Sequence, residues 1–152
     1  MQLWRLVKTR YAATAFDGEG ARIHGGRWNS PGTRVAYASS NSALAVLEVV
    51  VHMTAGVGLA GYSLVRASIP DSRVEELLAS DLPKNWSGSP VPPEVQAIGD
   101  AWARSGRALA ITVPSAIVPG SYNVLINPAH AAFAELTVET IEAFTFDHRL
   151  VR

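Results

Sequence analysis

The sequence predicts an α+β fold in which helices flank a mixed, mostly antiparallel sheet. Strand-like and helix-like stretches both occur in its 152 residues, but they do not alternate steadily. Steady βαβ alternation is typical of parallel α/β sheets, so its absence favours an antiparallel or mixed sheet. The length suits one domain, residues 1–152, and a hydrophobic content of 48% suits a large core.

The first half of the chain contains two expected strands separated by a glycine-rich segment. Residues 3–7 are expected to form a strand that carries Arg5, and residues 11–26 are expected to be a loop, because glycine recurs in them. The alternating pattern of residues 34–38 predicts a second strand, with Tyr37 on one face.

A strongly apolar helix is expected to follow, and then a third strand. The expected strand spans residues 62–69 and is closed by Pro70. The helix has several polar candidates for its N-cap, and glycines are expected to end it. The candidate caps are Ser39, Ser40, Asn41 and Ser42, and the glycines are Gly56, Gly58 and Gly61.

The second half of the chain centres on one well-marked helix. Pro93 suits the first turn of a helix that runs to residue 105 and ends at Gly106. The proline-rich residues 83–93, which include Trp86, are expected to form a surface loop. The remaining expectations are short helices at 73–79 and 129–136, and strands at 108–113, 122–126 and 142–146.

The charge balance argues against a nucleic-acid or lipid-binding surface. Thirteen basic and thirteen acidic residues cancel, so no electrostatic footprint for nucleic acid or an anionic membrane is evident. All basic residues except Lys8 and Lys84 are arginines, however, and arginine suits bidentate contacts with phosphate. A local arginine-lined pocket therefore remains compatible with the composition.

The chain is interpreted as a cytoplasmic protein. It has no cysteine, which excludes disulfides and thiol chemistry and is compatible with a reducing compartment. The first ten residues lack the apolar region of a signal peptide. The longest apolar run, residues 43–53, is interrupted by Glu48 and His52 and is too short to span a bilayer.

Glu48 is the strongest candidate for a functional residue. Aliphatic residues surround it in sequence, and a carboxylate among such neighbours is costly to bury without a partner. It is therefore expected to line a cleft or to pair with a cation such as Arg27. A purely structural ion pair is the main alternative.

Three further candidates precede Glu48 in the same stretch. Arg27 follows two glycines, so that its guanidinium and nearby backbone amides can face one anion. Tyr37 and Trp28 carry rings that can stack on a flat heteroaromatic group, although packing in the core is the ordinary role of such rings.

The remaining candidate functional residues are supported by weaker sequence patterns. Ser115 and Asn123 flank a predicted turn, which both residue types favour. A catalytic triad of Ser115, His130 and Glu48 is a minor alternative, because no GxSxG elbow surrounds the serine. The four histidines show no paired-ligand spacing, so no metal site is expected, and neither a Rossmann fingerprint nor a Walker loop is present.

Three separated runs of the sequence resemble the RES-domain family. They are LWRLVKTRYA, GARIHGGRWNSPGTRVAYASSNSALAVLE and PSAIVPGSYNVLINPAH. By motif match, the arginine, glutamate and serine for which the family is named fall on Arg27, Glu48 and Ser115. Arg5 and Asn123 also match positions of the pattern, and residues 70–105 are its least diagnostic part.

The resemblance implies a fold like that of ADP-ribosyltransferase toxins and an NAD-consuming activity. It implies a toxin of a type II toxin–antitoxin system, held inactive by an Xre-like antitoxin with a helix-turn-helix domain. The expected catalytic residues are Arg27, Tyr37 and Glu48, and the expected substrate-binding residues are Arg5, Trp28, Ser115 and Asn123.

The leading interpretation is thus a toxin that cleaves the nicotinamide–ribose bond of NAD by hydrolysis or phosphorolysis. The alternatives are a mono-ADP-ribosyltransferase that modifies a protein, and a non-catalytic module that binds a nucleotide or a partner. NAD is expected as substrate, with no further cofactor and no metal. The hydrophobic fraction is compatible with a homodimer but does not decide the assembly.

Overall fold

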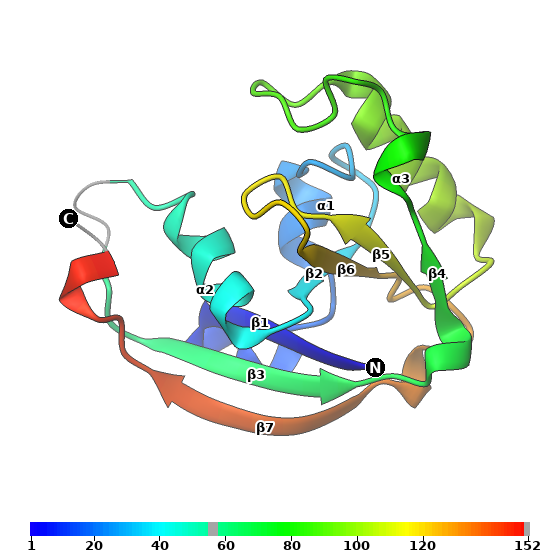
Figure 1. Ribbon diagram of the computed structural model, residues 1–152. Coiled ribbons are helices and arrows are strands. Elements are labelled where there is room, and N and C mark those ends of the chain that lie inside the picture. The colour runs from blue at the N-terminus through cyan, green and yellow to red at the C-terminus, as the bar shows by residue number, and fades with distance from the viewer. Residues whose placement is uncertain (55–57, 151–152) are drawn as a thin grey trace.

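The fold was analysed in a computed structural model, which describes residues 1–54 and 58–150. Within these residues, seven strands form one sheet in the order β4-β5-β6-β2-β1-β3-β7 (Figure 1). Only β4 and β5 pair in parallel among the described strands, so the predicted α+β class with a mixed, mostly antiparallel sheet is confirmed. The strands are β1 (Gln2–Lys8), β2 (Ala36–Ser39), β3 (Tyr62–Ser68), β4 (Val74–Glu76), β5 (Ala110–Pro114), β6 (Tyr122–Ile126) and β7 (Thr137–Phe144).

The sheet parts between its two central strands. β1 pairs with β3 along its whole length, from Gln2 to Lys8, but among the described residues it pairs with β2 at one position, Trp4 with Ser39. Next to this position, Nη1 of Arg5 donates a hydrogen bond to the carbonyl oxygen of Tyr37 on β2. A side chain thus joins the two halves of the sheet where the backbone ladder stops.

In the described part of the chain, three α-helices flank the sheet: α1 (Glu19–His24), α2 (Ser42–Val50) and α3 (Pro93–Ser105). α2 packs beside β1, where Val46 joins Leu6 and Tyr62 in one apolar cluster. α3 lies at the other end of the molecule (Figure 1), and its Val95 and Trp102 pack against residues of β5 and β6. A third cluster, which includes Leu3, Val65 and Leu109, forms the core around the middle strands.

The N-cap of α2 is one of the four candidates, and α3 begins and ends where the sequence predicts. Asn41 N-caps α2, and its side-chain oxygen accepts a hydrogen bond from the amide of Leu44 at 2.9 Å. α2 ends at Val50, before the glycines that were expected to end it; of these, Gly56 lies outside the described residues. α3 begins at Pro93 as predicted and ends at Gly106, which adopts the left-handed conformation (φ 61°).

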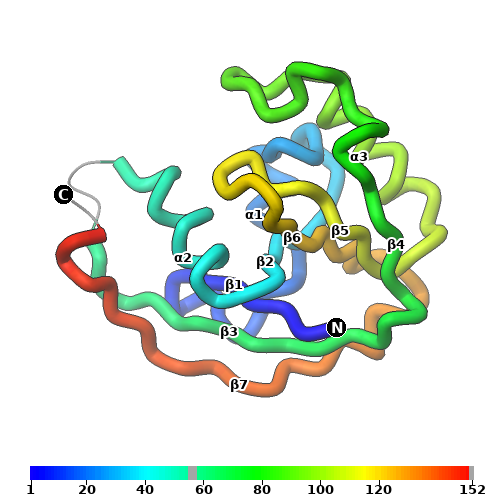
Figure 2. The backbone as a smooth tube through the Cα atoms, viewed as in Figure 1, coloured from blue at the N-terminus to red at the C-terminus, as the bar shows by residue number. Residues whose placement is uncertain are grey.

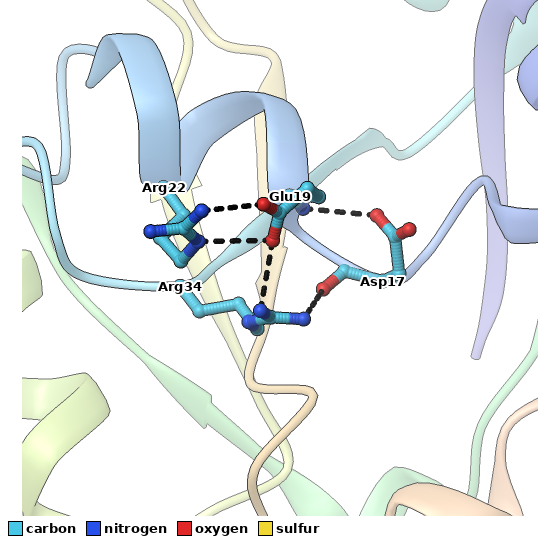
Figure 3. Close-up of polar contacts among 4 residues, drawn as sticks. All are labelled: Asp17, Glu19, Arg22 and Arg34. Atoms are coloured by element: carbon cyan, nitrogen blue, oxygen red, sulfur yellow. Dashed lines mark hydrogen bonds and ion pairs between the residues drawn. The ribbon is translucent and has the colours of Figure 1, made fainter.

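The expectation that residues 11–26 form a loop was wrong. A 3₁₀ helix, η1 (Thr9–Thr14), extends into this segment, and α1 lies within it. Glu19 binds Arg22 through two hydrogen bonds and forms an ion pair with Arg34 at 2.8 Å (Figure 3), and the bond from Arg22 holds the pKa of Glu19 below its usual value. Glycine lowers the helix propensity of the segment, but contacts distant in sequence stabilise the helix nonetheless.

Residues 73–79 do not form the predicted helix either. Residues 71–73 are a 3₁₀ turn, and β4 (Val74–Glu76) pairs with β5, so Val74 lies opposite Ala110. Pairing with a buried strand overrides the local pattern here. The helix expected at 129–136 is a single 3₁₀ turn, η4 (Phe133–Glu135), and the last strand spans 137–144 rather than 142–146. In the described part of the chain, no helix is long and apolar enough to cross a membrane.

Candidate functional site

A cleft of about 620 Å³ lies where the sheet parts. β1 and β2 form its floor, and α2, residues 25–28, the loop of residues 83–93 and the turn between β5 and β6 contribute its walls. Figure 2 shows this turn and α2 facing each other across the open side of the sheet. The cleft therefore collects segments that are far apart in the sequence.

Glu48 lies on the cleft-lining side of α2 and is half-buried. Its Oε1 accepts a hydrogen bond from Nδ2 of Asn123, and Oγ of Ser115 lies 3.5 Å from the same oxygen. Within residues 1–54 and 58–150, no group hydrogen-bonds Oε2. Of the two environments expected for Glu48, the structure shows the cleft, and its partners are neutral groups rather than Arg27.

α2 is buried on one side only. Val51, directly after the helix, is 50% exposed, and only residues 44–46 of the helix are fully buried. The apolar residues of the second helical turn instead form part of the cleft wall and of the cluster around Tyr62.

The register of the sheet orients Asn123 toward Glu48. Asn123 on β6 lies opposite Ser39 on β2, and Oγ of the buried Ser39 donates a hydrogen bond to Oδ1 of Asn123 at 2.7 Å. With its oxygen occupied in this way, the amide presents its N–H to the carboxylate. The two hydrogen bonds, from Ser39 to Asn123 and from Asn123 to Glu48, fix the position of one carboxylate oxygen.

Ser115 shapes the turn between β5 and β6. It is 5% exposed, and its Oγ accepts hydrogen bonds from the amides of Ile117 and Val118, both at 3.1 Å. The serine thus acts in turn formation, with a long contact to Glu48 as its link to the cleft. His130 does not complete a triad, because its Nδ1 accepts a hydrogen bond from the amide of Ala132.

Arg27 is held by neutral groups. Its Nη1 donates hydrogen bonds to the carbonyl oxygens of Trp86, at 2.8 Å, and Gly88, at 3.0 Å. Among the described residues Arg27 forms no ion pair, whereas Arg22, Arg73, Arg107 and Arg149 each bind a carboxylate. The positive charge of Arg27 is therefore oriented within the cleft without being neutralised.

Arg5 is a second cation at the cleft with no acidic partner among the described side chains. Its Nη1 donates a hydrogen bond to the carbonyl oxygen of Tyr37, and its Nε is shielded from solvent and has no hydrogen-bond partner within residues 1–54 and 58–150. Burial lowers the pKa of Arg5 to about 10, and the fields of Asp17 and Tyr37 partly oppose this effect. Arg5 is thus protonated at neutral pH.

Tyr37 uses its hydroxyl to hold the segment that carries Arg27. The hydroxyl donates a hydrogen bond to Oδ1 of Asn29 at 2.7 Å and accepts one from the amide of Trp28 at 3.0 Å. Burial raises the pKa of Tyr37 well above its usual value, so the phenol stays neutral. Trp28 is only 3% exposed, and its ring stacks on Trp86 with centroids 6.0 Å apart.

The model of the RES domain matches residues 2–147 of this chain. The chain belongs to the RES-domain family. It is 38% identical over 152 residues to "Toxin Res" of Yersinia enterocolitica, which covers 99% of each chain. It is 36% identical to "Prs ADP-ribosylating toxin" of Sphingobium sp., over 98% of this chain and 96% of that protein.

The fold of this RES domain is also that of a solved structure. A chain in the crystal structure of the M. tuberculosis MbcT–MbcA toxin–antitoxin complex superposes with a TM-score of 0.76. The match covers 95% of this chain and 84% of that chain, at 22% sequence identity.

In this RES domain, residues of α3 that the sequence motifs did not mark support the site. Gln96 donates hydrogen bonds to the carbonyl oxygens of Gly26 and Asn29, at 3.0 and 3.3 Å. Asp100 accepts hydrogen bonds from the amide and the hydroxyl of Ser30. Burial opposes ionisation of Asp100, but these bonds, with one from Thr33 and the field of Arg104, leave its pKa below the usual value.

Gly99 lies between these two residues, and a Cβ there would stand 1.7 Å from the carbonyl oxygen of Trp28. Asn29, which is 0% exposed, completes this support. The spacing of Gln96, Gly99 and Asp100 on one face of the predicted helix was a signal that the family motifs did not include. Among the described residues, no group of three or more His, Cys, Asp or Glu side chains is placed to hold a metal ion.

Proposed function

We propose that this RES domain is a toxin that degrades NAD by cleaving the bond between nicotinamide and ribose. The observation that carries the proposal is the composition of the cleft. Among the described residues, one carboxylate, Glu48, lines it together with two arginines, Arg5 and Arg27, whose hydrogen-bond partners are neutral carbonyls. Free positive charge suits a diphosphate, and a carboxylate suits a developing cation.

The proposed reaction requires few protein groups besides these three charged side chains. The nicotinamide of NAD is positively charged and departs as a neutral molecule, so no general acid is needed. The bond to the ribose breaks with its electron pair moving to nicotinamide, and the ribose acquires oxocarbenium character. The ionised Glu48 stabilises that charge, and the arginines bind the diphosphate. NAD is the substrate in this scheme, and no further cofactor or metal is required.

The group that attacks the ribose defines two versions of the reaction. Water or phosphate gives free ADP-ribose or its phosphorylated form, and this is our leading proposal. A protein side chain gives an ADP-ribosylated protein instead. The relative named "Prs ADP-ribosylating toxin", 36% identical over nearly the whole chain, favours keeping this second version.

Labelled NAD distinguishes these products. The purified protein is incubated with NAD carrying label in the adenylate part, with and without phosphate, and with and without cell extract. Free ADP-ribose, a phosphorylated ADP-ribose and a labelled protein band are the three diagnostic results. Absence of nicotinamide release under all conditions would overturn the proposal and favour a non-catalytic binding module.

We further propose that an antitoxin, of the Xre-like class with a helix-turn-helix domain, holds the protein inactive. The similarity in fold to a chain of a toxin–antitoxin complex supports such a partner. Expression of the wild-type chain is expected to arrest growth, and co-expression of the antitoxin to relieve the arrest. Glu48→Ala is expected to abolish the arrest, and growth arrest by this variant would contradict an enzymatic cause.

A further inference from the structure

The loop of residues 83–93 makes three contacts with Arg27 and Trp28 at the cleft. The proposed reaction assigns no role to these contacts. Two carbonyl oxygens of the loop, from Trp86 and Gly88, accept hydrogen bonds from the same nitrogen of Arg27. The indole of Trp86 stacks on the buried Trp28, with an angle of 29° between the planes. Because Trp28 follows Arg27 directly, the loop contacts two consecutive residues of the segment that lines the cleft.

These contacts divide the guanidinium of Arg27 into a bound and a free part. Nη1 has two hydrogens, and the two carbonyl oxygens use both of them. In the described part of the chain, Nε and Nη2 have no hydrogen-bond partner. Neither is among the buried polar atoms that lack a partner, so both are open to solvent in the cleft that Arg27 lines.

The free part has the geometry that a phosphate group prefers. Nε and Nη2 form one edge of the planar fork and donate two parallel hydrogen bonds, the arrangement seen in bidentate phosphate recognition. The bound part reaches neutral acceptors, which hold the plane of the fork without cancelling its charge. A freely rotating arginine would lose more side-chain entropy when it binds the same anion.

We propose that Trp86 is a positioning residue for the diphosphate of NAD, and that it acts through Arg27. By stacking on Trp28, it fixes the loop whose carbonyls orient the guanidinium, so that Nε and Nη2 face the substrate. This inference rests on the proposed function only for the identity of the diphosphate ligand. It assigns substrate affinity, rather than the chemical step, to a loop that the family motifs do not mark.

A double-mutant cycle tests whether Trp86 acts through Arg27. The affinity for ADP-ribose is measured by calorimetry for the wild type, Trp86→Ala, Arg27→Ala and the double variant. Trp86→Ala is expected to weaken binding about tenfold in the wild-type background, the size of about one hydrogen bond to a charged group. In the Arg27→Ala background the same change is expected to alter the affinity by less than about twofold.

Two further variants separate positioning from a general effect on the fold. Trp86→Phe keeps an aromatic ring against Trp28 and is expected to restore most of the affinity. Lys84→Ala, an exposed position on the same loop, is expected to leave the affinity unchanged. In NAD turnover, Trp86→Ala is expected to raise KM with little change in kcat.

Several results would overturn the inference. Equal losses from Trp86→Ala in both backgrounds would mean that the tryptophan does not act through Arg27, and failure of ADP-ribose to bind the wild type would remove the proposed ligand. The proposed function fails on a different readout, the release of nicotinamide. Coupled binding of ADP-ribose without nicotinamide release would therefore sustain the inference and overturn the enzymatic proposal.

Discussion

Glu48 and Asn123, 75 positions apart in the chain, are joined by a hydrogen bond from the amide of Asn123 to one oxygen of the carboxylate. The bond crosses the cleft edge from β6 to α2, and Ser39 fixes the amide on its other side. One oxygen of Glu48 is thus anchored, while the other has no partner among the described residues. An acid held in this way presents its free oxygen in a constant direction.

Asn123→Asp tests this relationship through charge. The variant replaces the amide that donates a hydrogen bond to Glu48 with a second carboxylate, which repels the first and cannot hold its oxygen in place. Because the proposed reaction depends on the orientation of Glu48, kcat for nicotinamide release is expected to fall at least about tenfold. Ser39→Ala is the milder control, since it loosens the amide without adding charge. An unchanged kcat in Asn123→Asp would show that Asn123 does not control Glu48.

Tyr37→Phe separates a structural from a catalytic role of the phenol. The change leaves the buried amide of Trp28 and the oxygen of Asn29 without their partner, which is expected to cost about 1–3 kcal/mol of unfolding free energy. Urea denaturation measures this loss, with Tyr11→Phe, at a 54% exposed position, as the control. Unchanged stability with a collapse of kcat would instead assign the hydroxyl to the chemistry, in line with the role that the RES motif implies.

Gly99→Ala probes the contact between α3 and the segment that carries Arg27. Alanine favours a helix by about 1 kcal/mol over glycine, but its Cβ would overlap the carbonyl oxygen of Trp28. The clash forces the helix away from the segment, so a net loss of about 1–3 kcal/mol is expected from urea denaturation. Gly20→Ala in α1 has open space around its Cβ and serves as the control, expected to be neutral or stabilising. Equal stability of the two variants would contradict the packing of α3 described above.

Asp100→Asn predicts a pH-dependent difference in stability. The pKa of Asp100 is lowered in the folded protein, so its ionised form stabilises the fold above the pKa of the unfolded chain. This contribution disappears as the pH falls through the folded-state pKa. The difference in unfolding free energy between wild type and Asp100→Asn is therefore expected to be full at pH 7 and to shrink below about pH 4. A difference that stays constant from pH 7 to pH 3 would rule out the charge as its cause.

The sequence predicted the parts of the site that lie within one continuous stretch. Glu48 stood out because it is the single acid in an apolar helix, and residue type limited the N-cap of that helix to four candidates, of which Asn41 is the cap. The pairing of Asn123 with Ser39 could not be predicted from the sequence, because the register between strands distant in sequence is set by the whole sheet. For the same reason β4 was mistaken for a helix, since among the described strands it pairs with β5 alone.

The roles of the two arginines show where residue type stops being informative. The family motif marked Arg27 and Arg5. Glu48, which lines the same cleft, forms a hydrogen bond with neither arginine. Their partners are backbone carbonyls of Trp86, Gly88 and Tyr37, which any residue supplies. The identity of the side chains therefore does not predict these contacts, and it takes the fold to show that neither arginine pairs with an acid among the described residues.

The central claim is that the free oxygen of Glu48 stabilises the cation that forms when nicotinamide leaves. Glu48→Gln keeps the size and one acceptor oxygen of the side chain but removes its charge. The direct measurement compares this variant with the wild type in both ADP-ribose affinity and the rate of nicotinamide release from NAD. The account predicts an affinity within about threefold of the wild type and a kcat at least about a hundredfold lower. Release of nicotinamide at the wild-type rate by Glu48→Gln would contradict it.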